Sequence, residues 1–416
     1  MKILVIAEDI RVNSTSAGIC NSNFIDGLLQ LNQKIDLVYD FSESDDLSWF
    51  QNQENLTSYS IHPLKKDTLT SKLVDVVPKM NSVFAKITGF GYSDLLKIKA
   101  WTKKIKYLVN NQDYKCVIFL GAGNSMLNYF SILKINFNVP ILVNFHDPYP
   151  DNQYPFPYTK NNNVANKIKS KKTDKIITKA TFVSFPSQRL YEWMSNFHSQ
   201  LTNKTIIIPH INAKLVGLPS LIEDDSVNLK PDSFNIVHGG SLLGHRNPEF
   251  LIKAFTKFID EDIERKEKAF LNIFGRIVEE NHLNKKYIDN CSNIVIVNKR
   301  ISYKKSKEIF SKSDVLLVLE TVSNDSPFLP GKFIDYLDAN KNILALTSPN
   351  SEIARLLTPQ YPYLSEIDNI EKIYNILVNL WNNWKESKLV NQVPSYLNEY
   401  VSIQQLQKFI KKIDTK

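Results

Sequence analysis

Cysteine is scarce in this sequence, with three residues in a chain of 416. Cys20, Cys116 and Cys291 are widely separated, and none of them belongs to a CxxC pair. An odd number of distant cysteines excludes a disulfide framework and a CxxC metal site, and it favours a reducing compartment. We therefore expect a cytoplasmic protein.

Long apolar runs are also missing. No stretch approaches the ~20 consecutive apolar residues that a membrane-spanning helix needs, and residues 1–7 are too short and too strand-like for a signal peptide. Hydrophobic residues make up 43% and charged residues 23% of the chain, which is typical of a soluble protein with sizeable cores. Because 416 residues exceed what one core usually serves, we expect two domains.

Positive charge is present in excess, with a formal net charge of +8. Such an excess indicates an anionic partner. Charge alone does not decide whether that partner is a nucleotide diphosphate, an anionic lipid or a nucleic acid. Lysines concentrate in residues 97–106, on a predicted amphipathic helix that contains Trp101, and in residues 167–179. Charge runs usually lie on solvated faces; the alternative is contact with an anionic membrane or a lipid-pyrophosphate acceptor.

The amino-terminal half alternates predicted buried strands with helices. Strands at 1–7 and 35–39 flank a helix that follows Gly18, and this order is the start of a doubly wound domain. His146 follows another strand, at the carboxyl end where doubly wound folds place ligand groups. The alternative for His146 is a histidine that satisfies loop carbonyls. Further strands are predicted at 115–120, 140–145, 181–187 and 205–210, whereas residues 42–93 carry little periodicity.

The carboxy-terminal half restarts the same pattern. A strand at 234–238 runs directly into Gly239, Gly240 and Ser241, and Arg246 precedes the next helix. Glycines let backbone N–H groups approach phosphate oxygens, and a helix amino terminus adds favourable partial charge. The pattern therefore predicts a phosphate site, with a tight turn and a surface arginine as the alternative.

A second candidate phosphate site lies further along the chain. Residues 315–319 form an unbroken apolar run, typical of a strand buried on both faces, and Glu320 follows it. Lys332 falls on the first turn of the next predicted helix, where a cation can bind phosphate, with Asp335 three residues later. The alternative is a solvated Lys–Asp pair, which is common and weak.

The run FLPGKFIDYLDANKNILAL resembles the donor-binding segment of bacterial glycosyltransferases with the GT-B architecture, especially retaining family 4 and its relatives. The family pattern reads roughly S-P-x-K-x-x-E-Y-x-A-x-G-K-P. Asp335 replaces the family's second glutamate, and Pro327 stands where the first would fall. Glu320 or Asp325 is therefore left to contact the donor sugar. The matching residues are Pro330, Lys332, Tyr336, Ala339 and Lys341.

The resemblance implies an α/β fold of two facing Rossmann-like doubly wound domains. Residues 1–212 would form an amino-terminal acceptor-binding domain, and residues 230–395 a carboxy-terminal nucleotide-sugar-binding domain. Residues 211–232 have no clear periodicity and are predicted as the linker. A final helix within residues 396–416 would cross back to the amino-terminal domain.

The resemblance also implies residue roles. Lys332 would hold the donor diphosphate and Asp335 the ribose hydroxyls. Arg246 lies where the second of two basic residues is found, and Ser241 replaces the first. His146 would face the donor sugar. The predicted catalytic residues are thus His146, Arg246, Lys332 and Glu320, and the predicted donor-binding residues are Gly18, Gly239, Gly240, Ser241, Arg300 and Asp335.

The implied function is transfer of a sugar from a nucleoside-diphosphate sugar to a glycan or lipid-linked acceptor, in bacterial surface polysaccharide synthesis. The resemblance implies retention of configuration and a location in the cytoplasm or on the inner face of the membrane. No metal and no cofactor besides the nucleotide sugar is expected, since residues 260–262 match a DxD motif but end a helix. Alternatives are a nucleotide-sugar epimerase on the same fold and, disfavoured because no binding motif is present, a non-enzymatic nucleic-acid-binding protein.

Overall fold

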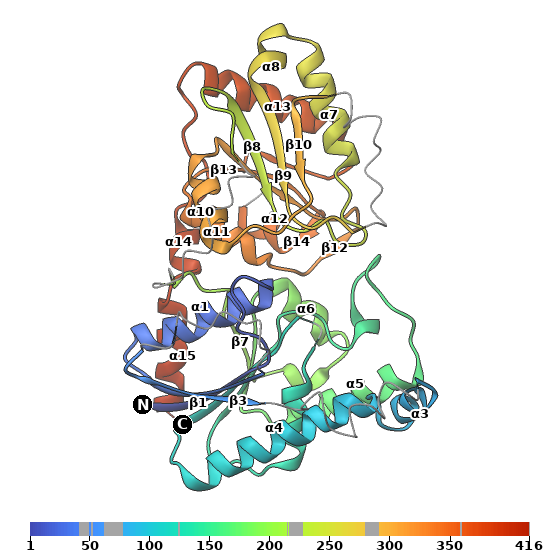
Figure 1. Cartoon of the computed structure of the whole chain (residues 1–416), viewed down its shortest axis with the longest axis vertical. Helices are drawn as coiled ribbons and strands as arrows, with labels where there is room; N and C mark the ends of the chain where they lie inside the picture. Colours follow the sequence, from blue (N-terminus) through green and yellow to red (C-terminus); the bar gives the residue numbers. More distant parts are fainter. Residues whose placement is uncertain are drawn as a thin grey trace. The chain divides into compact units, whose positions relative to one another are not determined.

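The computed structural model describes residues 1–40, 50, 53–61, 78–123, 125–213, 215, 228–278, 291–357 and 360–415. The chain forms two compact units (Figure 1). Unit 1 comprises Met1–Leu218 together with Val401–Lys416, and unit 2 comprises Pro219–Tyr400. The predicted linker falls largely outside the described residues. The domain limits predicted from the sequence, residues 1–212 and 230–395, stay a prediction.

Unit 1 is built on a seven-stranded parallel sheet in the order β3-β2-β1-β4-β5-β6-β7. The strand order reverses between β1 and β4, so this is the point where open α/β sheets bind ligands at their carboxyl edge. The central strands β4, β5 and β6 are buried along their whole length, and β1 along all but its first residue, because helices cover both faces. The strands are β1 (Lys2–Ala7), β2 (Lys34–Asp40), β3 (Leu56–Ile61), β4 (Cys116–Leu120), β5 (Ile141–Asn144), β6 (Phe182–Phe185) and β7 (Thr205–Ile207).

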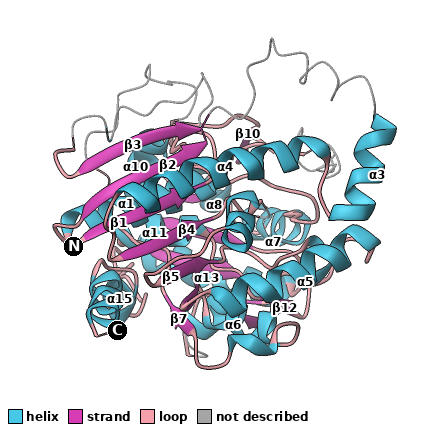
Figure 2. Ribbon diagram, turned by 90° about the horizontal axis from the view of Figure 1, so that it is seen from below, coloured by secondary structure: helices cyan, strands magenta, loops and turns pink. Residues whose placement is uncertain are grey.

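Two cores, one on each face, hold the helices of unit 1 to the sheet (Figure 2). One contains Trp101 and Ile105 of α4 (Tyr92–Asn111) and Ile176 of α5 (Val164–Lys179). The other contains Phe24 of α1 (Ser16–Gln30) and Phe409 of α15 (Gln404–Asp414). The remaining helices are α3 (Pro78–Thr88), η2 (Leu127–Lys134), η3 (Asp151–Gln153), α6 (Gln188–Ser195) and η4 (Ser199–Leu201).

Unit 2 is built on a six-stranded parallel sheet in the order β10-β9-β8-β11-β13-β15. The strands are β8 (Phe234–Gly239), β9 (Ala269–Phe274), β10 (Ile294–Val297), β11 (Val315–Leu319), β13 (Asn342–Leu346) and β15 (Leu364–Ser365), and a separate short pair joins β12 (Asp325–Ser326) to β14 (Asn350–Ser351). The helices are α7 (Glu249–Asp260), α8 (Ile263–Lys268), α10 (Tyr303–Lys312), α11 (Gly331–Asp338), α12 (Glu352–Leu357), α13 (Ile370–Lys385) and α14 (Tyr396–Tyr400).

The predicted fold class, two doubly wound α/β units with a carboxy-terminal helix that returns to the first, is confirmed. One expectation was incomplete. Within residues 42–93, which gave no assignment, the structure places β3 and α3, while residues 42–49, 51–52 and 62–77 lie outside its described part. The apolar segment after β4 forms the 3-10 helix η2.

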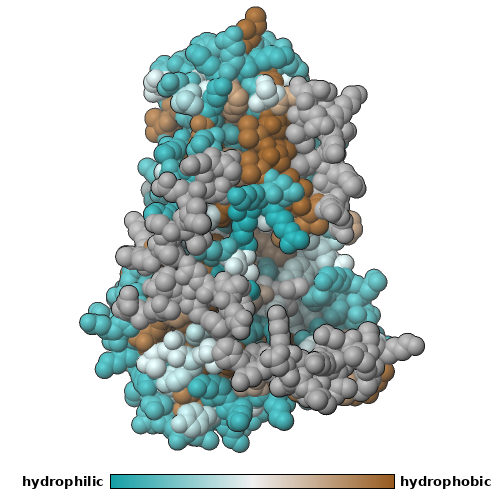
Figure 3. Space-filling model, in the orientation of Figure 1, coloured by the Kyte–Doolittle hydropathy of each residue, from teal (hydrophilic) through white to brown (hydrophobic). Residues whose placement is uncertain are grey.

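Hydrophilic residues cover most of the surface that is coloured in the view of Figure 3. Among the described residues, no helix combines the length and the apolar character needed to cross a membrane.

We predict that the returning helix α15 stabilises unit 1. Phe409 is 1% exposed and its ring centroid lies 5.9 Å from that of Phe182, so Phe409→Ala leaves a cavity between helix and sheet. Such a truncation is expected to cost about 3–5 kcal/mol of the free energy of unfolding. Urea unfolding followed by circular dichroism measures the loss. Lys411→Ala, on the exposed side of the same helix, is the control and is expected to be near neutral; equal stability of both variants would contradict the prediction.

Candidate functional site

The candidate site of unit 2 begins where the loops after β8 and β9 pack against each other. Gly275 has φ +145°, and a Cβ atom on it would lie 2.2 Å from the carbonyl oxygen of Gly240. A Cβ atom on Gly239 would lie 2.3 Å from ring carbons of Phe310, on α10. The loops therefore approach each other at a distance that only glycine permits at these positions.

The backbone N–H groups of the double glycine are already engaged. The N–H of Gly239 donates to Tyr336 Oη at 3.0 Å, and the N–H of Gly240 donates to the carbonyl of Phe274 at 2.8 Å. The sequence predicted that these two N–H groups stabilise an anion. In this conformation both already donate to protein oxygens, so that role does not follow from the structure. The carbonyl of Ser241, the next residue, accepts from Arg246 Nη1 at 3.3 Å.

Two cations lie beside this loop pair. Lys332, on the first turn of α11 as predicted, has its Nζ 5.5 Å from the ring centroid of Phe310. Burial lowers the pKa of Lys332; Asp335 opposes this shift, and Arg300 adds to it by repulsion. Burial raises the pKa of Glu320, and the positive charge of Arg246 opposes this rise.

Histidine 238, the penultimate residue of β8, lies among these cations and was missed from the sequence. Its side chain is 5% exposed. Nδ1 lies 3.0 Å from the carbonyl oxygen of Leu317 on β11. Nε2 is buried and has no hydrogen-bond partner in the described structure. A Cβ atom on Gly240 would lie 3.2 Å from this Nε2 and 3.8 Å from Lys332 Cδ. Burial, reinforced by Arg246 and Lys332, lowers the pKa of His238 to about 4.

The predicted carboxylates are both buried and bound. Asp335 accepts from Tyr303 Oη at 2.7 Å, and burial raises its pKa. Because Asp335 is 5% exposed, the alternative of a solvated Lys–Asp pair does not hold. Glu320 accepts from the hydroxyl of Thr347 and from the N–H of Ser348 at 3.3 Å. Asp325, the alternative to Glu320, lies on β12 opposite Asn350.

The remaining predicted residues lie in unit 1. Gly18, near the start of α1, donates its N–H to Thr15 Oγ1 at 2.8 Å, and a Cβ atom on it would lie 2.4 Å from the carbonyl oxygen of Arg11. His146 follows β5 and has its Nε2 2.8 Å from Asn21 Oδ1. Since the side-chain amide of Asn21 donates to two backbone carbonyls, its oxygen accepts and His146 Nε2 carries the proton. Burial lowers the pKa of His146 to about 4.

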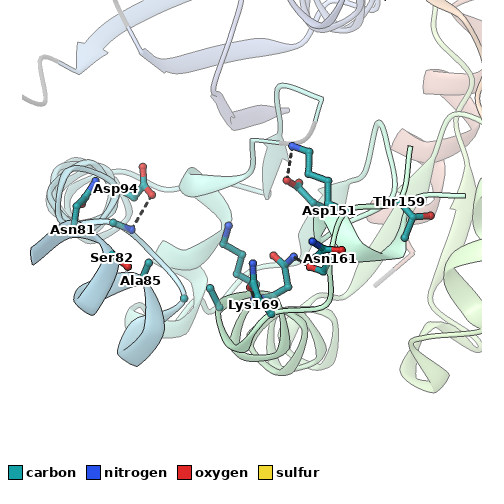
Figure 4. A pocket seen from close by; sticks show the side chains of 14 residues that line it. Asn81, Ser82, Ala85, Asp94, Asp151, Thr159, Asn161 and Lys169 are labelled. Atoms are coloured by element: carbon teal, nitrogen blue, oxygen red, sulfur yellow. Dashed lines mark hydrogen bonds and ion pairs between the residues drawn. The ribbon is translucent and has the colours of Figure 1, made fainter. Parts of the chain in front are cut away.

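Unit 1 also has a polar hollow of about 760 Å³ at the amino-terminal ends of α4 and α5, which the sequence did not indicate (Figure 4). Asn81, Asp94, Asp151, Asn161 and Lys169 are among the residues that line it. Its lining offers amide, carboxylate, hydroxyl and ammonium groups, which are the groups that bind the hydroxyls of a saccharide.

Metal ligands do not gather in the described part of the chain, where no group of three or more His, Cys, Asp or Glu side chains could hold an ion. In the DxD-like sequence, Asp260 ends α7, and Asp262 caps α8 by accepting from the N–H of Arg265 at 3.0 Å. These carboxylates therefore serve helix ends.

The structure thus brings most of the predicted residues together at the carboxyl edge of the unit 2 sheet. Gly18 and His146 belong to the corresponding edge of unit 1. The arrangement in unit 2 is cationic, which is the charge that suits an anionic ligand.

Solved structures with the same arrangement of elements are known. Sucrose-phosphate synthase from Thermosynechococcus elongatus matches with a TM-score of 0.66 at 11% identity, over 100% of both chains. A trehalose-6-phosphate protein from E. coli bound with UDP-2-fluoro glucose matches with a TM-score of 0.63 at 12% identity, over 99% of both chains. HepE from Anabaena in complex with UDP and glucose matches with a TM-score of 0.60 at 8% identity, over 100% of both chains. The chain has the GT-B fold. No protein-family model and no curated protein matches it.

This geometry predicts a large difference between two glycine variants of the GT-B chain. In Gly275→Ala the new Cβ meets the Gly240 backbone at a φ of +145°. The expected cost is about 1–3 kcal/mol for the conformation and a further ~1–3 kcal/mol for the forced contact. Gly244→Ala is the matched control, because a Cβ there meets nothing within 4 Å and only its φ of +52° is unfavourable, at about 1–2 kcal/mol. Thermal unfolding compares them; an equal loss would show that the loops are not in contact.

Proposed function

We propose that this protein is a glycosyltransferase that moves a sugar from a nucleoside-diphosphate sugar onto a glycan or lipid-linked acceptor, in bacterial surface polysaccharide synthesis. The observation that carries the proposal is the convergence of Arg246 and Lys332 on the loop pair after β8 and β9. Cations held at the carboxyl edge of a doubly wound sheet suit a diphosphate. The nucleotide and sugar ligands of the E. coli and Anabaena proteins, which share the fold, support the same ligand class.

In the proposed reaction, the bond between the anomeric carbon and the diphosphate breaks while an acceptor hydroxyl attacks that carbon. Negative charge grows on the departing diphosphate, and Lys332 and Arg246 stabilise it more in the transition state than in the ground state. The resemblance implies retention of configuration. We expect no requirement for a metal ion, because fixed cations already neutralise the leaving group. Glu320 and Asp335 would orient the donor through hydroxyl contacts.

The acceptor is proposed to bind unit 1. His146 would face the donor sugar, and the Gly18 loop would approach the acceptor and the donor phosphates, as the resemblance implies. The polar hollow beside α4 and α5 offers hydrogen-bonding groups for further saccharide units of a long acceptor. In this hollow, hydrogen bonds from the protein would replace those that water makes to the saccharide hydroxyls. A glycan could therefore be selected without a charge on the acceptor.

Removal of either cation tests the proposal. Lys332→Ala and Arg246→Ala are each expected to remove about 2–4 kcal/mol of transition-state stabilisation, or roughly two to three decades in turnover. Transfer from radiolabelled UDP- and GDP-sugars to acceptors in a membrane extract is the measurement, with circular dichroism to verify folding. Lys312→Ala, which removes an exposed lysine from α10 of the same unit, is the control.

The same assay has three decisive outcomes. Excess EDTA is expected to leave turnover unchanged, and loss of activity that Mn²⁺ restores would contradict the metal-independent mechanism. Near-wild-type turnover in both cation variants would sink the assignment of the diphosphate site. Release of an epimerised nucleotide sugar without transfer would favour the epimerase alternative instead.

Peripheral contact with an anionic membrane is the finer part of the proposal. The apolar stripe of the lysine-rich helix α4 lies in a core of unit 1, so it is not free to enter a bilayer. Lys97 pairs with Asp40 at 3.2 Å, and Lys172 Nζ donates to the carbonyl of Thr88 at 2.7 Å. Attraction to lipid therefore depends on the lysines that remain exposed, among them Lys99, Lys103, Lys106, Lys167, Lys171 and Lys175.

We predict binding to phosphatidylglycerol vesicles that weakens as salt rises, because a Debye length of ~8 Å at physiological salt screens surface charge. Each lysine near the surface contributes about 1 kcal/mol, so Lys171→Ala with Lys175→Ala should weaken binding roughly thirtyfold. Lys411→Ala with Lys412→Ala on α15 is the matched control. Cosedimentation measures the binding; equal binding to neutral vesicles, or none to either kind, would contradict membrane contact.

A further inference from the structure

We propose that His238 takes up a proton when the donor diphosphate binds, and that its imidazolium then donates Nε2–H to a diphosphate oxygen. The proposal rests on the donor site described above. In this proposal His238 binds the diphosphate in place of the basic residue that Ser241 replaces. Donor binding is then coupled to protonation of His238.

The tautomer of His238 follows from its contacts. The carbonyl oxygen of Leu317, 3.0 Å from Nδ1, can only accept, so Nδ1 carries the proton of the neutral ring. Nε2 then presents a lone pair, and no donor reaches it in the described structure. A buried polar atom without a partner is unfavourable and calls for an explanation such as a ligand. A Cβ atom on Gly240 would lie 3.2 Å from this nitrogen, so glycine at this position keeps a side chain from crowding it.

The surroundings explain why the ring is neutral. Arg246, in the loop after β8, and Lys332, on α11, both repel a proton on His238, and burial acts in the same direction. Of the nearby carboxylates, Asp335 is bound by Tyr303, and Glu320 by Thr347 and Ser348. Arg300, between β10 and α10, adds positive charge that Lys332 experiences. The imidazole therefore has cations near it, and no carboxylate of the described residues forms a hydrogen bond with it.

A bound diphosphate reverses this balance. Its negative charges offset Arg246 and Lys332, so the part of the pKa lowering that these cations cause is removed and the pKa of His238 rises, while burial still acts on the ring. The proton comes from solvent and enters at Nε2, the only ring nitrogen with a free lone pair. Because the complex holds more protons than the free protein, donor affinity increases as pH falls and is lost as pH rises through the pKa of the bound state.

Calorimetric titration with UDP-glucose and GDP-mannose tests the proposal, since their diphosphates carry no group that titrates between about pH 5 and 8. Binding heats in buffers of different ionisation enthalpy give the number of protons taken up. We expect up to one proton, and a Kd that weakens by as much as tenfold per pH unit where uptake is complete. Absence of uptake across this range would overturn the proposal. Failure of both nucleotide sugars to bind would overturn the donor site itself.

Two variants assign the proton. His238→Asn keeps an N–H that can reach the Leu317 carbonyl but has no basic nitrogen, and it should abolish the uptake and the pH dependence of Kd. His245→Asn, an exposed histidine of the same loop, is the matched control and should retain both. Uptake that persists in His238→Asn would assign the proton to another buried group of the site, such as Lys332, Glu320 or Asp335, whose pKa values burial also shifts, and would overturn the proposal.

A direct readout on the wild-type protein covers the case in which His238→Asn does not fold. Carbon-13 labelling of the imidazole rings resolves the seven histidines by NMR. At pH 6, one ring is expected to change from a neutral to a protonated shift on addition of the nucleotide sugar. Rings that all keep their protonation state would contradict the inference.

Discussion

The loop after β8 lies directly on the loop after β9, and the candidate site depends on this contact. The N–H of Leu242 donates to the carbonyl of Arg276 at 3.0 Å, so the two loops continue the parallel pairing of their strands beyond the sheet. Glycines at 240 and 275 make the approach possible. The path of the chain toward Arg246 is therefore fixed by backbone contacts, and Arg246 reaches back to the Ser241 carbonyl.

Electrostatics gives this arrangement its chemical character. Arg246, Lys332 and Arg300 act on the same small region, and repulsion among like charges disfavours holding them there without an anion. The protein reduces the repulsion in two ways: His238 stays neutral, and the ring of Phe310 faces the Lys332 ammonium. A diphosphate in this region would reduce the remaining repulsion. The residues whose positive charges repel one another are therefore the ones proposed to bind the donor.

Much of this fold could be predicted because buried parallel strands leave an unbroken apolar signature, as Val315–Leu319 does. The edge strand β3 lacks that signature, since most of its residues are partly or fully exposed, and it was not recognised. In the site, strand ends predicted Arg246 and Lys332 as phosphate ligands, which stays a prediction, and the structure places both beside the glycine loop. Sequence could not indicate that Gly239 is bound by Tyr336, or that His238 meets Leu317, because 97 and 79 residues separate these partners.

Comparison of the buried histidines explains why resemblance pointed to one and geometry to the other. His146 follows β5 and His238 lies near the end of β8, so both are at the carboxyl edge of a sheet, and burial lowers the pKa of each to about 4. The Nε2 of His146 donates to Asn21, and its ring stacks on His210 with centroids 5.4 Å apart. For His238, burial is reinforced by two cations, and its Nε2 has no hydrogen-bond partner in the described structure. An anion beside those cations would remove part of the cause that keeps His238 neutral, whereas burial is the cause that acts on His146. Binding of an anion can thus raise the pKa of a neutral histidine only where nearby positive charges contribute to its neutrality.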